Sequence, residues 1–149
     1  MSNDHIVSSF DADLNRLDNM IAEMGGLAET QLTRSIEALC KRDLEAAERI
    51  IPADKKIDAL EEEIYEFTIK LLALRQPMAD DLRIVISAIK ISSVIERIGD
   101  YAKNISKRTI VLKDSPSLTG ALHTVSRMGE LVQTMIKQAL DAYIQRDAE

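Results

Sequence analysis

Acidic side chains recur at four-residue intervals in two separate stretches of the chain. Asp54 and Asp58 form one pair, and Glu96, Asp100 and Asn104 form a series in the other. Residues four apart lie on the same face of an α-helix, so each stretch would present its side-chain oxygen atoms along one helical face. Such rows of oxygen atoms suit the binding of a hard cation or acid–base chemistry.

A turn near Pro77 would bring the two stretches together. Proline disfavours helical geometry in the residue before it and is well suited to begin the next helix, so the flanking helices would run antiparallel. Counting outward from this turn places Asp58 opposite Glu96 and Asp54 opposite Asp100. We therefore expect the two acid pairs at the same level of a helical bundle.

Carboxylates gathered at one level repel each other, and Glu61 and Glu62 add to the crowding. At an effective dielectric constant of about 20, two like charges about 4 Å apart cost on the order of 4 kcal/mol, and less where they are exposed. Water and separation, protonation, a bound cation or nearby basic side chains could each offset this repulsion. The basic side chains in question are Lys55, Lys56, Arg97 and Lys103. The residues alone leave open both a solvated charged face and a metal site.

A metal ion at this level would be bound by oxygen atoms. His5 and His123 are far from the acids in the sequence, and Cys40 falls in a different predicted helix. Carboxylate sites suit Mg²⁺, Mn²⁺, Ca²⁺ or ferric iron better than zinc, which favours nitrogen and sulfur ligands. The Glu-x-x-His pairs that are typical of di-iron bundles do not occur in the sequence.

Long helices are expected to position the acids. The 149 residues are 46% hydrophobic and only 3% aromatic, and apolar residues recur in alternating steps of three and four. Helices are predicted over residues 10–41, 44–75 and 78–112, with a fourth from about residue 121 to the end. Their similar lengths and tight turns predict an all-α fold: an elongated antiparallel three-helix bundle, followed by the first helix of a second, incomplete bundle.

Glycines and prolines mark special positions within these helices. Pro52 predicts a kink or a restart in the second helix. Gly25 and Gly26 could mark either a kink or the close approach of a neighbouring helix. Because the apolar rhythm continues through both glycines, we expect an unbroken first helix. The apolar seam of the third helix is expected along Ile84, Ala88, Ile91, Ile95, Ile98, Ala102 and Ile105.

The charge balance and the lack of other motifs argue against several classes of function. A net charge of −6 makes nucleic acid and an anionic membrane surface poor partners. The sequence has no P-loop and no glycine-rich dinucleotide turn. Cys40 is the only cysteine, and neither a signal-peptide core nor an uncharged run of roughly 20 residues is present. These features predict a cytoplasmic protein.

Two segments of the chain repeat each other: "MGGLAETQLTRSIEALCKRDLE" at residues 24–45 and "MGELVQTMIKQALDAYIQRDAE" at residues 128–149. They align without gaps, and eight of the 22 positions are identical, including Met-Gly at one end and Arg-Asp at the other. We therefore expect a complete three-helix repeat at residues 1–113, a linker at 114–118 and the first helix of a second repeat at 119–149. A second repeat cut short in this way suggests a piece of a longer protein.

In several motifs the chain resembles the PhoU family of phosphate-transport regulators. The most specific are the "RQP…DLR" turn and the "ERIGD…N" helix, both within "LLALRQPMADDLRIVISAIKISSVIERIGDYAKNISKR". The family pattern is also matched by "MGG", "KRD", "ADKKID" and the tandem repeat. The resemblance implies two three-helix bundles, each with a multinuclear metal site built from paired (E/D)-x-x-x-D motifs. Those motifs fall here on Asp54 with Asp58 and on Glu96 with Asp100, and Asn104 follows in register as a further ligand.

The resemblance also implies an adaptor rather than an enzyme. Such an adaptor would act at the cytoplasmic face of the high-affinity phosphate transporter, contacting its ATPase subunit and a membrane histidine kinase. It would repress the phosphate-starvation response and restrain phosphate uptake. We further expect a homodimer, no nucleic-acid partner and no insertion into the membrane. Two rival hypotheses are a metal-dependent hydrolase with catalytic acids and a purely structural bundle.

Overall fold

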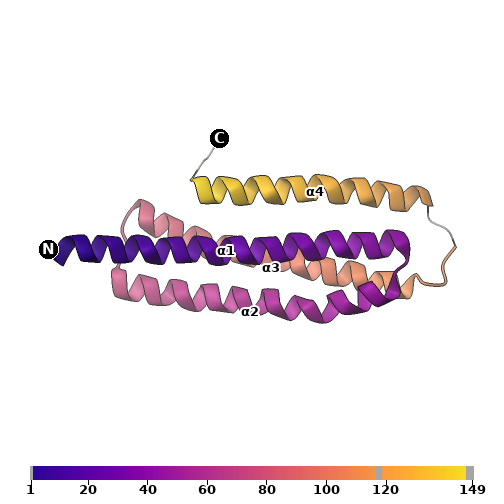
Figure 1. Ribbon diagram of the computed structural model, residues 1–149, viewed down its shortest axis with the longest axis horizontal. Helices are drawn as coiled ribbons and strands as arrows, with labels where there is room; N and C mark the ends of the chain where they lie inside the picture. Colours follow the sequence, from indigo (N-terminus) through magenta and orange to yellow (C-terminus); the bar gives the residue numbers. More distant parts are fainter. Residues whose placement is uncertain (1, 117–118, 147–149) are drawn as a thin grey trace.

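The computed structural model describes residues 2–116 and 119–146, with side chains from residue 9 onward. It contains four helices, α1 (Ser2–Lys41), α2 (Leu44–Arg75), α3 (Asp80–Val111) and α4 (Thr119–Gln145). α1 and α3 run in one direction, and α2 and α4 run in the other (Figure 1). Within the described ranges the chain forms no strand, so the arrangement of the helices is the whole architecture.

Local backbone features set the bounds of the helices. The side chain of Asp43 caps α2 by accepting a hydrogen bond, 3.0 Å long, from a backbone N–H in the first turn. α2 ends where Gln76 adopts a left-handed backbone with φ of 46°. Ala79 also has a positive φ, of 52°, so α3 begins at Asp80, two residues later than predicted.

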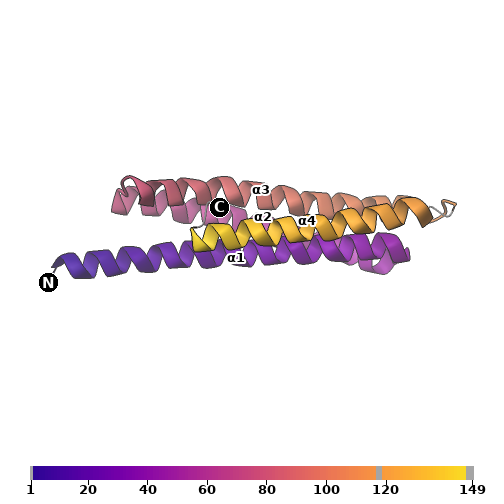
Figure 2. The same cartoon turned by 90° about the horizontal axis from the view of Figure 1, so that it is seen from above.

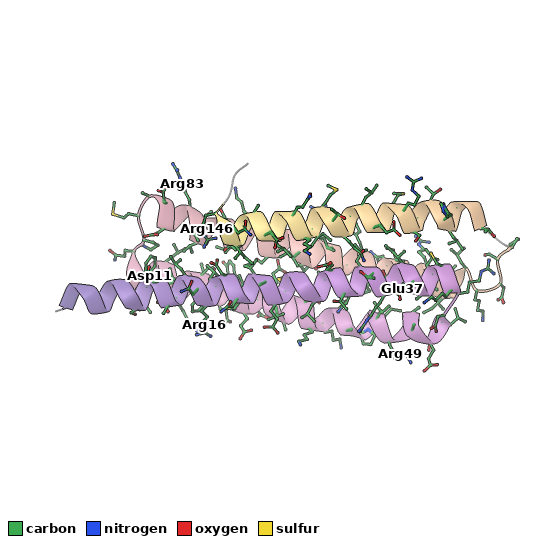
Figure 3. The ribbon with its side chains drawn as sticks, turned by 45° about the horizontal axis from the view of Figure 1, so that its top comes forward. Asp11, Arg16, Glu37, Arg49, Arg83 and Arg146 are labelled. Atoms are coloured by element: carbon green, nitrogen blue, oxygen red, sulfur yellow. The ribbon has the colours of Figure 1, made fainter. Side chains whose placement is uncertain are left out.

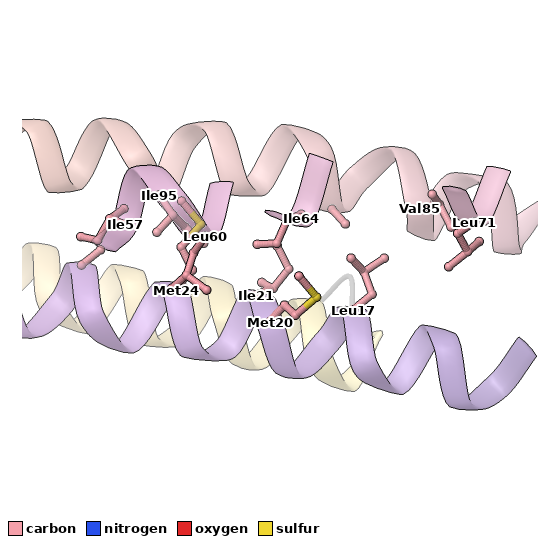
Figure 4. Close-up of a cluster of buried hydrophobic side chains, with 12 residues drawn as sticks. Leu17, Met20, Ile21, Met24, Ile57, Leu60, Ile64, Leu71, Val85 and Ile95 are labelled. Atoms are coloured by element: carbon pink, nitrogen blue, oxygen red, sulfur yellow. The ribbon is translucent and has the colours of Figure 1, made fainter. Parts of the chain in front are cut away.

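The hydrophobic core lies where α1, α2 and α3 meet (Figure 4). Leu17, Ile21 and Met24 of α1 are fully buried there, together with Ile57 and Ile64 of α2. Each aliphatic side chain buried in this way contributes roughly 1.5–3 kcal/mol relative to an exposed one. This shared core sets the antiparallel order of the three helices.

The face that α3 turns to the core matches the predicted seam only in part: Ala88, Ile95 and Ala102 are buried as predicted. Its buried residues are mostly small: Val85, Ala88, Ser92, Ile95, Gly99, Ala102, Ser106 and Thr109. Ile91, Ile98 and Ile105 of the predicted seam are only half-buried. The small residues let α3 approach its neighbours closely, and the larger isoleucines lie at the flank, where Ile98 and Ile105 pack near α4.

α4 packs against α1 (Figure 2). Gly25 of α1 lies against Leu140 of α4, and Gly129 of α4 lies against Ile36 of α1. A Cβ atom at either glycine would come within 2.5 Å of that neighbour, so both glycines permit a close approach. The two contacts are equivalent under the sequence repeat, because positions 129 and 140 each follow positions 25 and 36 by 104 residues. α1 and α4 therefore pair as two copies of one helix.

Two arginines related by the same repeat secure the ends of α4. Arg42 donates hydrogen bonds to the carbonyl oxygens of Ser115 and Pro116, at 2.8 and 2.9 Å. Arg146, labelled in Figure 3, donates to both carboxylate oxygens of Asp18, at 2.9 and 3.0 Å. The repeated Arg-Asp motif thus supplies one anchor at each end of the α1–α4 pair.

The predicted fold class is confirmed: the chain is all-α, with an antiparallel three-helix bundle followed by a further helix packed on it. α2 begins and ends at the predicted residues, and α1 continues through Gly25 and Gly26. α1 begins at Ser2, earlier than the predicted residue 10, and α2 bends near its start but does not restart at Pro52 (Figure 1). The division into units at residues 1–113, 114–118 and 119–149 stays a prediction.

No helix in the described ranges combines the length and apolar character needed to cross a membrane.

Candidate metal centre

Gly99 allows α2 and α3 to meet closely at the level of the acids. A Cβ atom at this position would lie 2.9 Å from Ile57 Cδ1 and 3.1 Å from Asp54 Oδ1. Every other residue type carries a Cβ atom, so only glycine leaves this space free. Glu96 and Asp100 lie on the turn of α3 around this contact and are thereby brought near the acids of α2.

Asp54 is a buried carboxylate with one satisfied oxygen and one unsatisfied oxygen. Its side chain is 2% exposed. Oδ2 accepts a hydrogen bond from the ammonium group of Lys103, whereas Oδ1 has no hydrogen-bond partner among the described residues. A buried carboxylate is costly unless it is paired, so this site requires a cation close to Asp54.

Lys103 supplies that positive charge from α3. Its Nζ atom bridges the two helices, because it also lies 3.0 Å from Oδ1 of Asp100. The hydrogen bond from Lys103 holds the pKa of Asp100 below its usual range. Hydrogen bonds to Asp54 and Asp100 in turn raise the pKa of Lys103 well above its ordinary value. Lys56 is another basic side chain considered from the sequence. Its Nζ atom instead lies 4.0 Å from Oε1 of Glu23 on α1.

Glu96 is held partly neutral. Loss of hydration raises the pKa of Glu96 to about 7, and a hydrogen bond with Asp100 and the charges of Asp100, Glu61 and Asp58 act in the same direction. Because the pKa of Asp100 is lowered, the proton in this pair resides on Glu96. Glu96 therefore binds a proton more readily than an ordinary glutamate does.

Two acids of α2 complete the cluster. Burial raises the pKa of Asp58, and the charges of Asp54 and Asp100 add to this effect. Burial also raises the pKa of Glu61, followed by the charges of Asp58 and Asp100. Glu61 belongs to the acidic half of the helix that the sequence showed, but it was not assigned to the site. Its position one turn after Asp58 was the signal for including it.

The structure brings Asp54, Asp58, Glu96 and Asp100 to one level, as the antiparallel pairing predicted. Asn104, one turn after Asp100, is exposed and lines a hollow of about 380 Å³ with Lys107, Arg108 and Val111. In the part of the chain that the structure describes, the side chain of Asn104 makes no hydrogen bond to the four carboxylates. The role of all five residues as metal ligands stays a prediction.

The chemistry of the donors fits a hard cation, but the present arrangement does not form a ready metal site. All the donors are oxygen atoms, and Asp54 Oδ1 is a buried acceptor with no hydrogen-bond partner among the residues that the structure describes. Across residues 2–116 and 119–146, however, no three His, Cys, Asp or Glu side chains converge closely enough to hold a metal ion. The ammonium group of Lys103 holds the place between Asp54 and Asp100. A metal ion bridging these two acids would have to take that place.

Residues 21–109 match the family described as the PhoU domain. A protein from Zymomonas mobilis named "Phosphate-specific transport system accessory protein PhoU homolog" is 47% identical over 143 residues, covering 96% of this chain and 60% of that protein. The protein of the same name from Caulobacter vibrioides is 40% identical over 146 residues, covering 98% of this chain and 64% of its own length.

The crystal structure of PhoU from Pseudomonas aeruginosa is similar in fold, with a TM-score of 0.88 at 36% identity. The match covers 93% of this chain and 66% of that one, so the chain spans about three-fifths to two-thirds of the length of these relatives. The PhoU-domain match includes the C-terminal half of α1, the whole of α2 and nearly all of α3, and with them the entire acid cluster. On this evidence the chain belongs to the PhoU family.

Proposed function

We propose that this chain is a non-catalytic, cytoplasmic accessory protein of high-affinity phosphate uptake. The observation that carries the proposal is its similarity, over 96–98% of its length, to relatives named phosphate-specific transport system accessory proteins. The net charge of −6 supports protein partners with basic surfaces rather than nucleic acid or anionic lipid.

The proposed partners are the ATPase subunit of the phosphate transporter and the membrane histidine kinase that senses phosphate. The chain would hold both in a repressed state when phosphate is plentiful, and it would act as a homodimer. Its long helices make a rigid scaffold, and its acidic faces would dock on these membrane-associated partners. Such docking requires no transfer of chemical groups, which is why we propose an adaptor and not an enzyme.

We further propose that Asp54, Asp58, Glu96 and Asp100 bind a hard cation, with Asn104 as an outlying ligand. Mg²⁺, Mn²⁺, Ca²⁺ or ferric iron fits this all-oxygen donor set better than zinc. Two observations support the proposal: the acids of two helices gather at one level, and Asp54 Oδ1 is buried with no hydrogen-bond partner in the described part of the chain. A cation bound there would join α2 to α3 and shape the acidic face for docking.

Deletion of the gene and its complementation test the proposed role. Deletion should derepress phosphate-responsive transcription in medium rich in phosphate, and the unaltered gene should restore repression. A gene carrying both Glu96→Gln and Asp100→Asn should restore it only weakly, at equal protein abundance. Unchanged transcription after deletion would overturn the regulatory role, and full complementation by the double variant would favour a purely structural bundle.

The gathering of carboxylates from α2 and α3 at one level leaves a metal-dependent hydrolase as the second hypothesis. The pKa of Glu96, raised to about 7, lies in the range that suits a general acid or base. A hydrolase would turn over phosphate esters in the presence of Mn²⁺, and Asp100→Ala would abolish turnover while leaving partner binding intact. The adaptor proposal expects no such turnover from the unaltered chain.

A further inference from the structure

We propose that Lys103 is a built-in counter-cation, which holds the acid cluster together without metal and competes with any metal ion that enters. The inference deepens the proposed function, since it concerns the occupancy of the same acid cluster. It makes the cluster a site with two alternative cations: the ammonium group of Lys103 and a metal ion.

The first support is the burial of Asp54. Its side chain is 2% exposed, so water cannot solvate the carboxylate, and the charge needs a cation within the protein. Lys103 fills this need for Oδ2 alone, because Oδ1 lacks a hydrogen-bond partner in the described ranges. The cluster is therefore neutralised only in part, with one buried oxygen still available.

The second support is the position of the ammonium group. Nζ contacts Asp54 on α2 and lies 3.0 Å from Asp100 Oδ1 on α3, so it joins the same two acids that a bridging metal ion would join. A metal ion bound there would sit directly against the ammonium group, and two positive charges at such a distance repel strongly. The two cations therefore exclude each other between Asp54 and Asp100.

The third support is the construction of the lysine side chain. Lys103 is 25% exposed, and its flexible four-carbon stem can turn outward without any movement of α3. Metal entry would thus require one side chain to swing into solvent rather than two helices to separate. This explains how the same backbone can serve a metal-free and a metal-bound state.

Calorimetric titration of the full chain with Mn²⁺ tests the competition. Lys103→Met removes the internal cation, so Mn²⁺ should bind about tenfold or more tightly than to the unaltered chain. Lys107→Met is the matched control: it removes an exposed charge one turn away on α3 and should change the affinity by less than about threefold. Lys103→Arg keeps the positive charge and should leave binding as weak as in the unaltered chain.

Thermal unfolding of the same variants supplies a second readout. In the presence of a chelator, Lys103→Met should unfold at a lower temperature than Lys107→Met, because Asp54 then lacks its counter-cation. Added Mn²⁺ should raise the unfolding temperature of Lys103→Met by more than that of the unaltered chain. Equal shifts in all variants would overturn the competition.

The outcomes separate this inference from the proposed function. Binding to Lys103→Met but not to the unaltered chain would confirm Lys103 as the occupant and remove metal from the proposed function. Equal affinity in Lys103→Met, Lys107→Met and the unaltered chain would overturn the inference and keep the metal proposal. Absence of Mn²⁺ binding in every variant would overturn both, while gene deletion would still test the regulatory role.

Discussion

At the scale of residues, the acid cluster depends on a division of charge states among neighbours. Lys103 stays cationic and Asp100 anionic, because each favours the charged form of the other. Protonation of Glu96, whose pKa is raised, reduces the negative charge of the cluster. Several carboxylates can thus gather at one level without the full cost of their repulsion.

The ion pair between Asp54 and Lys103 should be measurable as a coupling energy. Asp54→Ala removes a buried carboxylate and its partner contact, so the free energy of unfolding should fall by about 2–4 kcal/mol. Lys103→Met should lower the free energy of unfolding much less in the Asp54→Ala background than in the unaltered chain. The difference between the two effects, the coupling energy, should be about 1–3 kcal/mol. Urea unfolding of the two single variants and the double variant, followed by circular dichroism, measures it. Strict additivity would show that the pair contributes nothing.

Glu96 should make stability depend on pH. Its folded-state pKa of about 7 lies above its ordinary value of 4.5, so the folded chain binds more protons than the unfolded chain between these values. The free energy of unfolding contributed by Glu96 therefore falls as the pH rises through this window. Glu96→Gln removes this loss of stability. As the pH rises from 5 to about 8, the melting temperature of the variant should therefore gain about 1–3 °C relative to that of the unaltered chain. The effect is small because solvent screens the carboxylate.

The control for this pH dependence is Glu48→Gln, which makes the same change of charge at an exposed position of α2. Both variants are to be melted with a chelator present, at several pH values. A pH profile of Glu96→Gln that parallels that of Glu48→Gln would contradict the assignment of the raised pKa to Glu96.

The sequence predicted the pairing of the acids but not the role of Lys103. Four-residue spacing and an antiparallel turn suffice to place Asp58 and Glu96 at one level. The direction in which Lys103 extends depends on the rotation of α3 about its axis, and the predicted seam matched the buried face only at Ala88, Ile95 and Ala102. Lys103 was therefore only one of four basic side chains that could have neutralised the acids.

At the scale of elements, the part of the α3 seam that was misplaced has a physical cause. Sequence patterns assign the largest apolar residues to the core, and in α3 these are isoleucines at positions 84, 91, 98 and 105. Close packing of three helices instead favours small residues at their closest approach, such as Gly99 and Ala102. The isoleucines lie at the flank, where Ile98 and Ile105 pack near α4, a neighbour whose position the pattern of α3 does not reveal.

The adjacent glycines of α1 make a matched test of the α1–α4 contact. Gly26→Ala should stabilise the chain by about 0.5–1 kcal/mol, because nothing lies within 4 Å of a Cβ atom there and alanine favours the helix. Gly25→Ala gains the same propensity but must displace Leu140, so it should be about 1–2 kcal/mol less favourable. Urea unfolding measures both variants, and equal stabilisation would contradict the close packing of α4 on Gly25.

At the scale of the whole molecule, the repeat was visible in the sequence, whereas the burial of its two copies was not. Met128, Leu131 and Met135 of α4 are 59–66% exposed. They correspond to positions 24, 27 and 31 of α1, which lie in or beside the core. Equivalent positions are therefore buried in one copy and exposed in the other, because in the described part of the chain α1 packs against α2, α3 and α4, whereas α4 packs closely against α1 alone. A sequence pattern predicts which face can be buried, and the neighbouring helices decide whether it is.

The fold was predictable because long helices with short turns leave few ways to pack. The capped start of α2 and the turn near Pro77 fix the antiparallel order, and the repeat indicates that α4 is built like α1. The start of α1 was missed because residues 2–8 are mostly polar and lack the apolar rhythm that locates a helix. The identity of a bound cation depends on distances of a few tenths of an ångström, which no spacing rule supplies.

The central claim is that the acids of α2 and α3 together attract a cation. Equilibrium dialysis of the chain against Mn²⁺, followed by elemental analysis of both compartments, tests it most directly. The comparison is a variant carrying Asp54→Asn, Asp58→Asn, Glu96→Gln and Asp100→Asn, with helicity checked by circular dichroism. The account predicts excess Mn²⁺ with the unaltered chain and none with the folded variant; equal Mn²⁺ with both proteins would contradict it.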